Sequence, residues 1–103
     1  MSEWLVVHTQ LNAEARAEHH LRRQGYEVYC PRYAKTRRHA RRTERVIRAL
    51  FPRYLFVAFE MDCTPWRAIK STVGVNALVQ EGERPLIARQ GIIDAIQERE
   101  AAD

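Results

Sequence analysis

An arginine-rich segment has the clearest capacity for chemistry in this chain. Between positions 32 and 48, eight basic side chains face a single acid, Glu44. They are Arg32, Lys35, Arg37, Arg38, Arg41, Arg42, Arg45 and Arg48. Clustered guanidinium groups attract phosphate through bidentate hydrogen bonds and through counterion release. We therefore expect contact with a nucleic-acid backbone or an acidic protein groove; a solvated loop kept soluble by its charge is the alternative.

The first predicted helix carries a second set of residues suited to nucleic acid. Arg16, His20 and Arg23 follow spacings of four and then three, and so share one helix face, with Gln24 beside them. Such side chains bind phosphates and base edges. A solvated helix face has the same spacing, so the residues alone leave both interpretations open.

The remaining reactive residues do not indicate catalysis. The four histidines have no metal-ligand spacing with the cysteines or acids. There is no Cys-x-x-Cys pair, glycine-rich phosphate loop or nucleophile elbow. We expect no enzyme, no cofactor and no metal. Cys30 and Cys63 are expected to be reduced thiols of a cytoplasmic protein, and no apolar run is long enough to cross a membrane.

Residues 50–59 have the pattern of a strand that is apolar on both faces. The odd-numbered residues from 55 to 59 share one face, while Tyr54 and Phe56 lie on the other. A chain of 103 residues can cover one face of a sheet with its own helices. The second face, with its two rings, is therefore expected to meet a partner. His8 lies beside these rings if the even-numbered residues of the first strand point outward.

The elements that position these residues alternate between strand and helix patterns. Strands are expected at 4–8, 26–30, 50–59 and 75–79. Three helices are expected. The first is capped at Asn12, ends at Gly25 and has a buried stripe of Ala13, Ala17 and Leu21. The second runs from Thr64-Pro65 to Gly74, and the third is an amphipathic C-terminal helix marked by Ile92, Ile93 and Ile96. The predicted class is α/β (α+β), a four-stranded antiparallel sheet with helices mainly on one face, similar to split βαβ folds.

Two functions without catalysis fit these features. In the first, the chain is an RNA-recognition-type module that binds single-stranded nucleic acid, because residues 53–59 partly fit the strand whose rings stack on bases. That fit lacks a glycine before the first ring, and Leu55 replaces the small residue between the rings. In the second, the double-faced strand docks on a protein and the arginines contact nucleic acid nearby.

The order of motifs resembles the N-terminal (NGN) domain of the NusG family of transcription elongation factors, and especially its RfaH-type paralogues. The combination Phe-Pro-x-Tyr-Leu-Phe-Val followed by Gly-Val is quite specific. The resemblance spans about residues 3–100. The matching segments are Trp4-Leu5-Val6-Val7, Ala17-Glu18-His19-His20-Leu21 up to Gly25, Cys30-Pro31, Leu50-Phe51-Pro52-Arg53-Tyr54-Leu55-Phe56-Val57 and Thr72-Val73-Gly74-Val75.

The resemblance implies a domain that bridges the cleft of RNA polymerase and suppresses pausing. Family members dock an apolar patch on the clamp helices of the β′ subunit, and another edge reaches the gate loop of β. The positions that match the clamp-helix patch are His8, Phe51, Tyr54, Phe56 and Ile96. Trp66 and Arg67 fall at the gate-loop edge, where the paralogue pattern differs, and Trp66 could equally belong to the core.

The resemblance also implies DNA contact. In RfaH-type paralogues the first helix reads the non-template DNA strand, and His20, Arg23 and Gln24 match that pattern. Arg16 shares their face. Lys70 is included among the expected contacts although it differs from the family pattern, as do Gln10 and Val73. The basic segment falls in the hairpin expected between the second and third strands, well placed for non-template or upstream DNA, with candidate contacts at Arg37, Arg38, Arg41 and Arg42.

Domain organisation follows from the same resemblance. Full-length relatives carry a C-terminal KOW domain, and this chain ends about where the interdomain linker would begin. We expect one monomeric NGN domain over residues 1–103, with the KOW domain outside the chain. In RfaH-type proteins that domain can mask the polymerase-binding patch, so the patch could alternate between two partners.

Overall fold

A five-stranded antiparallel sheet forms the centre of the molecule. The computed structural model describes residues 3–60 and 64–102, with side chains up to residue 100. The strand order is β2-β5-β1-β6. The edge of β1 that faces away from β5 pairs with two strands: β9 along residues 3–5 and β6 along residues 7–9. The strands are β1 (Glu3–Thr9), β2 (Val28–Tyr29), β5 (Tyr54–Phe59), β6 (Val75–Leu78) and β9 (Ile87–Arg89).

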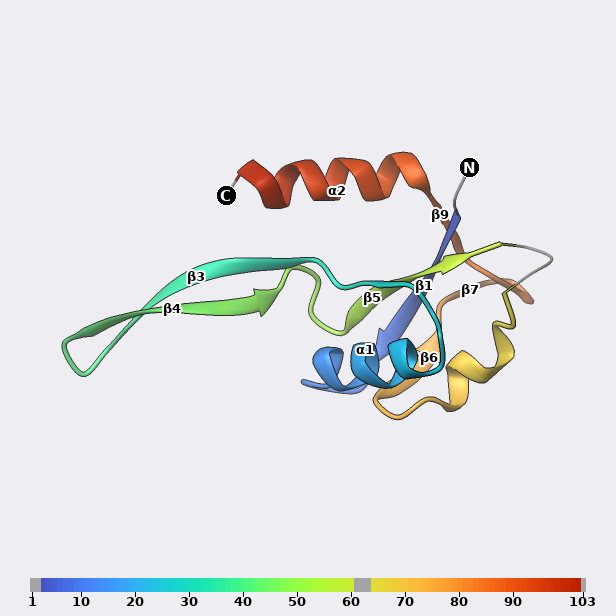
Figure 1. The fold of residues 1–103 in the computed structure, drawn as a ribbon, viewed down its shortest axis with the longest axis horizontal. Coiled ribbons are helices and arrows are strands. Elements are labelled where there is room, and N and C mark those ends of the chain that lie inside the picture. Colours follow the sequence, from blue (N-terminus) through green and yellow to red (C-terminus); the bar gives the residue numbers. More distant parts are fainter. Residues whose placement is uncertain (1–2, 61–63, 103) are drawn as a thin grey trace.

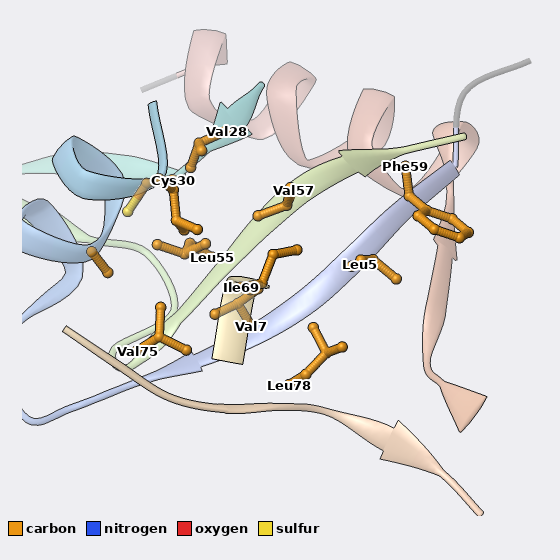
Figure 2. Packing of buried hydrophobic residues seen from close by; sticks show 12 residues of the cluster. Leu5, Val7, Val28, Cys30, Leu55, Val57, Phe59, Ile69, Val75 and Leu78 are labelled. Carbon is orange, nitrogen blue, oxygen red and sulfur yellow. The ribbon is translucent and has the colours of Figure 1, made fainter. Parts of the chain in front are cut away.

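One face of this sheet is covered by α1 (Glu14–Arg23) and by the 3-10 helix η1 (Arg67–Ser71) (Figure 1). The predicted stripe of Ala13, Ala17 and Leu21 is confirmed, since all three are buried. Ala17 and Leu21 belong to the same cluster as the odd-numbered residues of β1 and β5, which Figure 2 shows in one continuous group. Burial of this apolar stripe, rather than helix propensity, stabilises a ten-residue helix.

The opposite face is covered by α2 (Gln90–Ala102), which crosses it on the side away from α1 (Figure 1). Ile93 is fully buried there against Trp4, Phe56 and Ala88. The Trp4 indole also donates a 2.8 Å hydrogen bond to the Gln90 side chain at the start of the helix. The predicted α+β class with an antiparallel sheet is confirmed, but the sheet has five strands and not four, because β9 also pairs with β1. The expectation that this face stays uncovered is wrong, because Ile93 and Ile96 of α2 pack against apolar residues on it.

The basic segment forms a separate two-stranded hairpin of β3 (Arg32–His39) and β4 (Arg42–Ala49), which extends away from the sheet (Figure 1). Its strands pair in register from Arg32 opposite Ala49 to His39 opposite Arg42. The position expected for the hairpin, between the second and third strands of the sheet, is therefore confirmed. A shorter hairpin, β7 (Gln80–Glu81) with β8 (Arg84–Pro85), turns at Gly82.

Several local expectations change in detail. Asn12 does not cap α1: it has a φ of +56°, and Ala13 is the N-cap without any capping side chain. Gly25 does follow the helix end, with a φ of +95°. The second strand is shorter than predicted because the Tyr26 N–H bonds back to the Leu21 carbonyl and closes the helix instead. The helix expected from Thr64-Pro65 is a single 3-10 segment that begins three residues later.

The cysteine predictions are tested at one position. Cys30 is a buried free thiol, and burial raises its pKa, which keeps the sulfur protonated and weakly reactive at neutral pH. Cys63 lies outside the described residues. Among the helices in the described ranges, none is long and apolar enough to cross a membrane.

Candidate interaction surfaces

An apolar patch forms where five of the predicted residues meet; we use this name for His8, Phe51, Tyr54, Phe56 and Ile96. His8 and Tyr54 are directly opposite each other across β1 and β5, with ring centroids 5.1 Å apart. The Phe51 and Phe56 rings meet edge to face at 6.5 Å, and Ile96 packs against the cluster that contains Phe56. The assumption that even-numbered residues of the first strand face these rings is therefore confirmed.

The members of the apolar patch differ in exposure. Tyr54 is 40% exposed and Phe51 is 39% exposed, whereas Phe56 is only 7% exposed beneath α2. His8 and Ile96 are intermediate. Phe51 and Tyr54 are thus the rings that an incoming partner can contact, while Phe56 supports them from inside.

A groove of about 580 Å³ continues from the apolar patch and lies between α2 and the residues that directly follow β4. Ile92, on its rim, is 54% exposed. Helix α2 therefore has two apolar sides, one buried on the sheet through Ile93 and one facing the groove. Only Phe51 and Ile96 of these groove residues were predicted as binding residues, although the helical spacing from Ile92 to Arg99 could have indicated those on α2. The groove is lined by Leu50, Phe51, Gly91, Ile92, Ala95, Ile96 and Arg99.

The turn before β5, which carries Phe51 and Tyr54, contains an unusual backbone conformation at Arg53. Arg53 has a φ of +72°, in the left-handed region that costs a non-glycine residue about 1–2 kcal/mol. The Tyr54 N–H closes the turn on the Phe51 carbonyl at 3.0 Å. Because such strain persists only where surrounding contacts fix it, the neighbours of Arg53 matter for the shape of the apolar patch.

Trp66 and Arg67 lie at η1, on the face of the sheet opposite α2, so the structure does not bring them together with the apolar patch. Trp66 is half-buried against the core cluster under α1. The Arg67 guanidinium lies 5.5 Å from the centroid of the Trp66 ring, within cation–π range. Trp66 therefore belongs partly to the core, and Arg67 is the exposed member of this pair.

The predicted face of α1 is accessible. Arg16 and Arg23 are exposed and His20 is intermediate. The Gln24 amide donates a 2.8 Å hydrogen bond to the Thr72 hydroxyl and so joins the end of α1 to the segment that follows η1. Lys70, two residues before Thr72 and within η1, is exposed. The structure thus places a cation of η1 near the basic face of the helix.

Both faces of the β3–β4 hairpin are basic. Side chains directly opposite each other share a face, which puts Arg37 and Arg42 on one side and Arg38 on the other. Arg37 and Glu44 form an exposed ion pair at 3.7 Å. Arg41 lies in the turn with a φ of +68°. The four predicted arginines are all exposed, as phosphate contact requires.

Arg32 behaves differently from the other basic residues of this segment. Its guanidinium forms an ion pair with Glu18 of α1, and Glu18 also binds Arg22 at 2.9 Å. Burial raises the pKa of the Glu18 carboxyl, but hydrogen bonds and charges from Arg32 and Arg22 outweigh burial and lower it overall. The Arg32 N–H also donates to Glu100 of α2 at 3.2 Å. Arg32 therefore fixes the base of the hairpin to both helices.

Acidic, histidine and cysteine side chains do not gather into a metal site in the described parts of the chain: no group of three or more is placed to hold an ion. The surfaces described above comprise one apolar patch, one basic helix face and one basic hairpin.

Comparison with known proteins identifies the family. The model of the family described as "Transcription termination factor nusG" matches residues 2–97. The chain belongs to the NusG family of transcription factors. Among solved structures, it is similar to one from Thermotoga maritima described as "Domain interaction in Thermotoga maritima NusG", with a TM-score of 0.66 and 20% identity. The match covers 100% of this chain and 59% of that one, and at this identity it establishes the fold.

Proposed function

We propose that this chain is an elongation-factor domain that binds RNA polymerase through the apolar patch. The observation that carries this proposal is a pair of accessible rings in the apolar patch: Phe51, which lines the apolar groove, and Tyr54, which lies beside His8. Exposed aromatic anchors beside a groove are typical of protein-binding hot spots. Family membership supports the clamp helices of the β′ subunit as the partner. Binding there by a monomer, bridging the cleft toward β, reduces pausing.

The buried position of Phe56 favours this function over RNA recognition. A base-stacking sheet needs neighbouring rings that are open to solvent, and α2 covers Phe56. Of the two rings on that face of β5, Tyr54 is the accessible one. The RNA-recognition module is therefore the weaker candidate.

The basic surfaces supply contacts to DNA in this proposal. The exposed arginines near the turn of the β3–β4 hairpin bind the phosphates of upstream or non-template DNA, because their charge and exposure favour such contacts. They are Arg37, Arg38, Arg41 and Arg42. The α1 face with Arg16, His20, Arg23 and Gln24, joined by Lys70, meets the non-template strand in the manner of RfaH-type paralogues. Arg67 extends toward the β subunit from the far side of the sheet. A KOW domain in a full-length protein would compete for the apolar patch.

A binding measurement with core RNA polymerase tests the main proposal. We expect tight binding of the wild-type domain, and a loss of about 1–3 kcal/mol of binding free energy in Tyr54→Ala. Leu11→Ala is the matched control, because Leu11 is an apolar side chain that is 71% exposed outside the patch. Equal affinity for Tyr54→Ala and Leu11→Ala, or tight RNA binding through Tyr54 without polymerase affinity, would contradict the proposal.

The DNA contact is tested by the salt dependence of binding to a transcription complex. Arg41→Glu should weaken binding more at low salt than at high salt, and should reduce the slope of log K against log salt by about one or more. Arg84→Glu makes the same change in charge at an exposed site on β8. If binding of the two variants depends on salt in the same way, the hairpin does not contact DNA.

A further inference from the structure

The contacts of Glu14 reach from α1 to the turn that presents the apolar patch. A carboxylate in the first turn of a helix ordinarily interacts with the N–H groups and dipole of its own helix. The Glu14 carboxylate instead accepts a hydrogen bond of 3.1 Å from the backbone N–H of Arg53, 39 residues further along the chain. This N–H belongs to the residue that adopts the left-handed conformation.

The backbone of Thr9 in β1 also makes hydrogen bonds with Arg53. The Thr9 N–H donates to the Arg53 carbonyl at 2.7 Å, and the Arg53 Nε donates back to the Thr9 carbonyl at 3.3 Å. Thr9 is fully buried, so these contacts are sheltered from water. The Arg53 backbone is therefore fixed by the strand at its carbonyl and by the helix at its N–H. Of these two supports, only the bond to Glu14 depends on a side chain outside the turn.

We propose that Glu14 is a positioning residue for the apolar patch. Its carboxylate stabilises the left-handed turn at Arg53, and this turn sets the directions of the Phe51 and Tyr54 rings before a partner arrives. Preorganised rings bind more tightly because less conformational freedom is lost on association. The inference rests on the proposed polymerase-binding function, but the role of Glu14 in holding the turn is measurable without polymerase.

The first measurement is amide hydrogen exchange of the free domain. Glu14→Ala removes the acceptor, so the Arg53 N–H should exchange about tenfold faster, as expected for the loss of one hydrogen bond. The Leu21 N–H in the interior of α1 should not change. Glu14→Gln keeps a side-chain oxygen and loses the charge, and it should exchange as slowly as wild type. If the Arg53 N–H exchanges at the wild-type rate in Glu14→Ala, the carboxylate does not hold the turn and the positioning role is wrong.

The second measurement is a double-mutant cycle on polymerase binding. Glu14→Ala should weaken binding several-fold, while Glu14→Gln should bind like wild type. In a Tyr54→Ala background, Glu14→Ala should have a clearly smaller effect, because the ring whose direction it sets is absent. Equal effects of Glu14→Ala in the two backgrounds would overturn the proposal. Thermal unfolding of each variant shows that the comparison is made on folded protein.

The two readouts separate this inference from the proposed function. If the wild-type domain does not bind polymerase but the Arg53 amide responds as expected, the partner is wrong and the support of the turn by Glu14 stands. If polymerase binds through Tyr54 while neither the Arg53 amide nor the affinity responds to Glu14→Ala, the function stands and the positioning role fails.

Discussion

Tyr54 and Phe56 lie two residues apart on the same face of β5, yet α2 buries only Phe56. Ile93 packs on the Phe56 side of the strand, while the Tyr54 ring lies beside His8 and stays 40% exposed. The strand pattern gives the two rings equivalent positions. The structure gives them different tasks, one in the core under α2 and one at the surface.

The first prediction separates these two tasks. Phe56→Ala should reduce the free energy of unfolding by about 3–5 kcal/mol, because it leaves a cavity between β5 and α2. Tyr54→Ala should change stability by less than about 1 kcal/mol. Urea unfolding monitored by circular dichroism measures both values. Similar losses in the two variants would mean that α2 does not cover Phe56 preferentially.

The second prediction concerns the close approach of Gly74 to α1. A Cβ at position 74 would lie 2.8 Å from the Ala17 backbone nitrogen, and the φ of +89° adds strain. Gly74→Ala should therefore cost about 2–4 kcal/mol of stability. Gly25→Ala is the control, because Gly25 has a similar φ of +95° but no atom within 4 Å of the added Cβ, and it should cost only about 1 kcal/mol. Thermal or urea unfolding should rank the two variants in that order.

The third prediction is a pH dependence that arises from Glu18. The ion pairs with Arg32 and Arg22 hold the pKa of the Glu18 carboxyl below its usual value of 4.5, despite the opposing effect of burial. A depressed folded-state pKa stabilises the protein above the unfolded-state value, and this contribution is lost as the pH falls through the folded-state pKa. Wild type should therefore exceed Glu18→Gln in stability near neutral pH, and this difference should shrink below pH 4.5. A difference that does not change with pH would argue against the ion pairs.

The fourth prediction concerns the turn of the basic hairpin. Ala40 and Arg41 both have positive φ, at +49° and +68°, where asparagine and glycine are preferred. Ala40→Asn keeps every basic residue and should stabilise the hairpin by about 0.5–1 kcal/mol. Ala40→Val should have the opposite effect, because β-branched residues are poorly tolerated there. Amide exchange along β3 and β4 measures the change, and protection that fails to follow this order would contradict the turn conformation.

Much of the architecture follows from local pattern. The helical stripe of Ala13, Ala17 and Leu21 and the two-faced strand were predictable, because each is set by a periodicity within a short stretch of chain. The strand begins at Tyr54, however, and not at Leu50. Composition marked residues 32–48 as a basic segment, whereas its hairpin form was expected only from the family resemblance. Errors arose where a backbone group had two possible partners. The N–H of Tyr26, for example, closes α1 instead of extending β2.

The sequence by itself determined which residues are apolar, which are basic and how they repeat along each element. Tertiary structure decided which of them meet. In the folded protein α2 covers Phe56, Arg32 forms an ion pair with Glu18, and the Glu14 carboxylate accepts a hydrogen bond from the Arg53 N–H. These contacts join residues 14 to 39 positions apart. They depend on how the sheet and helices pack, since local periodicity fixes the face of an element but not the partner of that face.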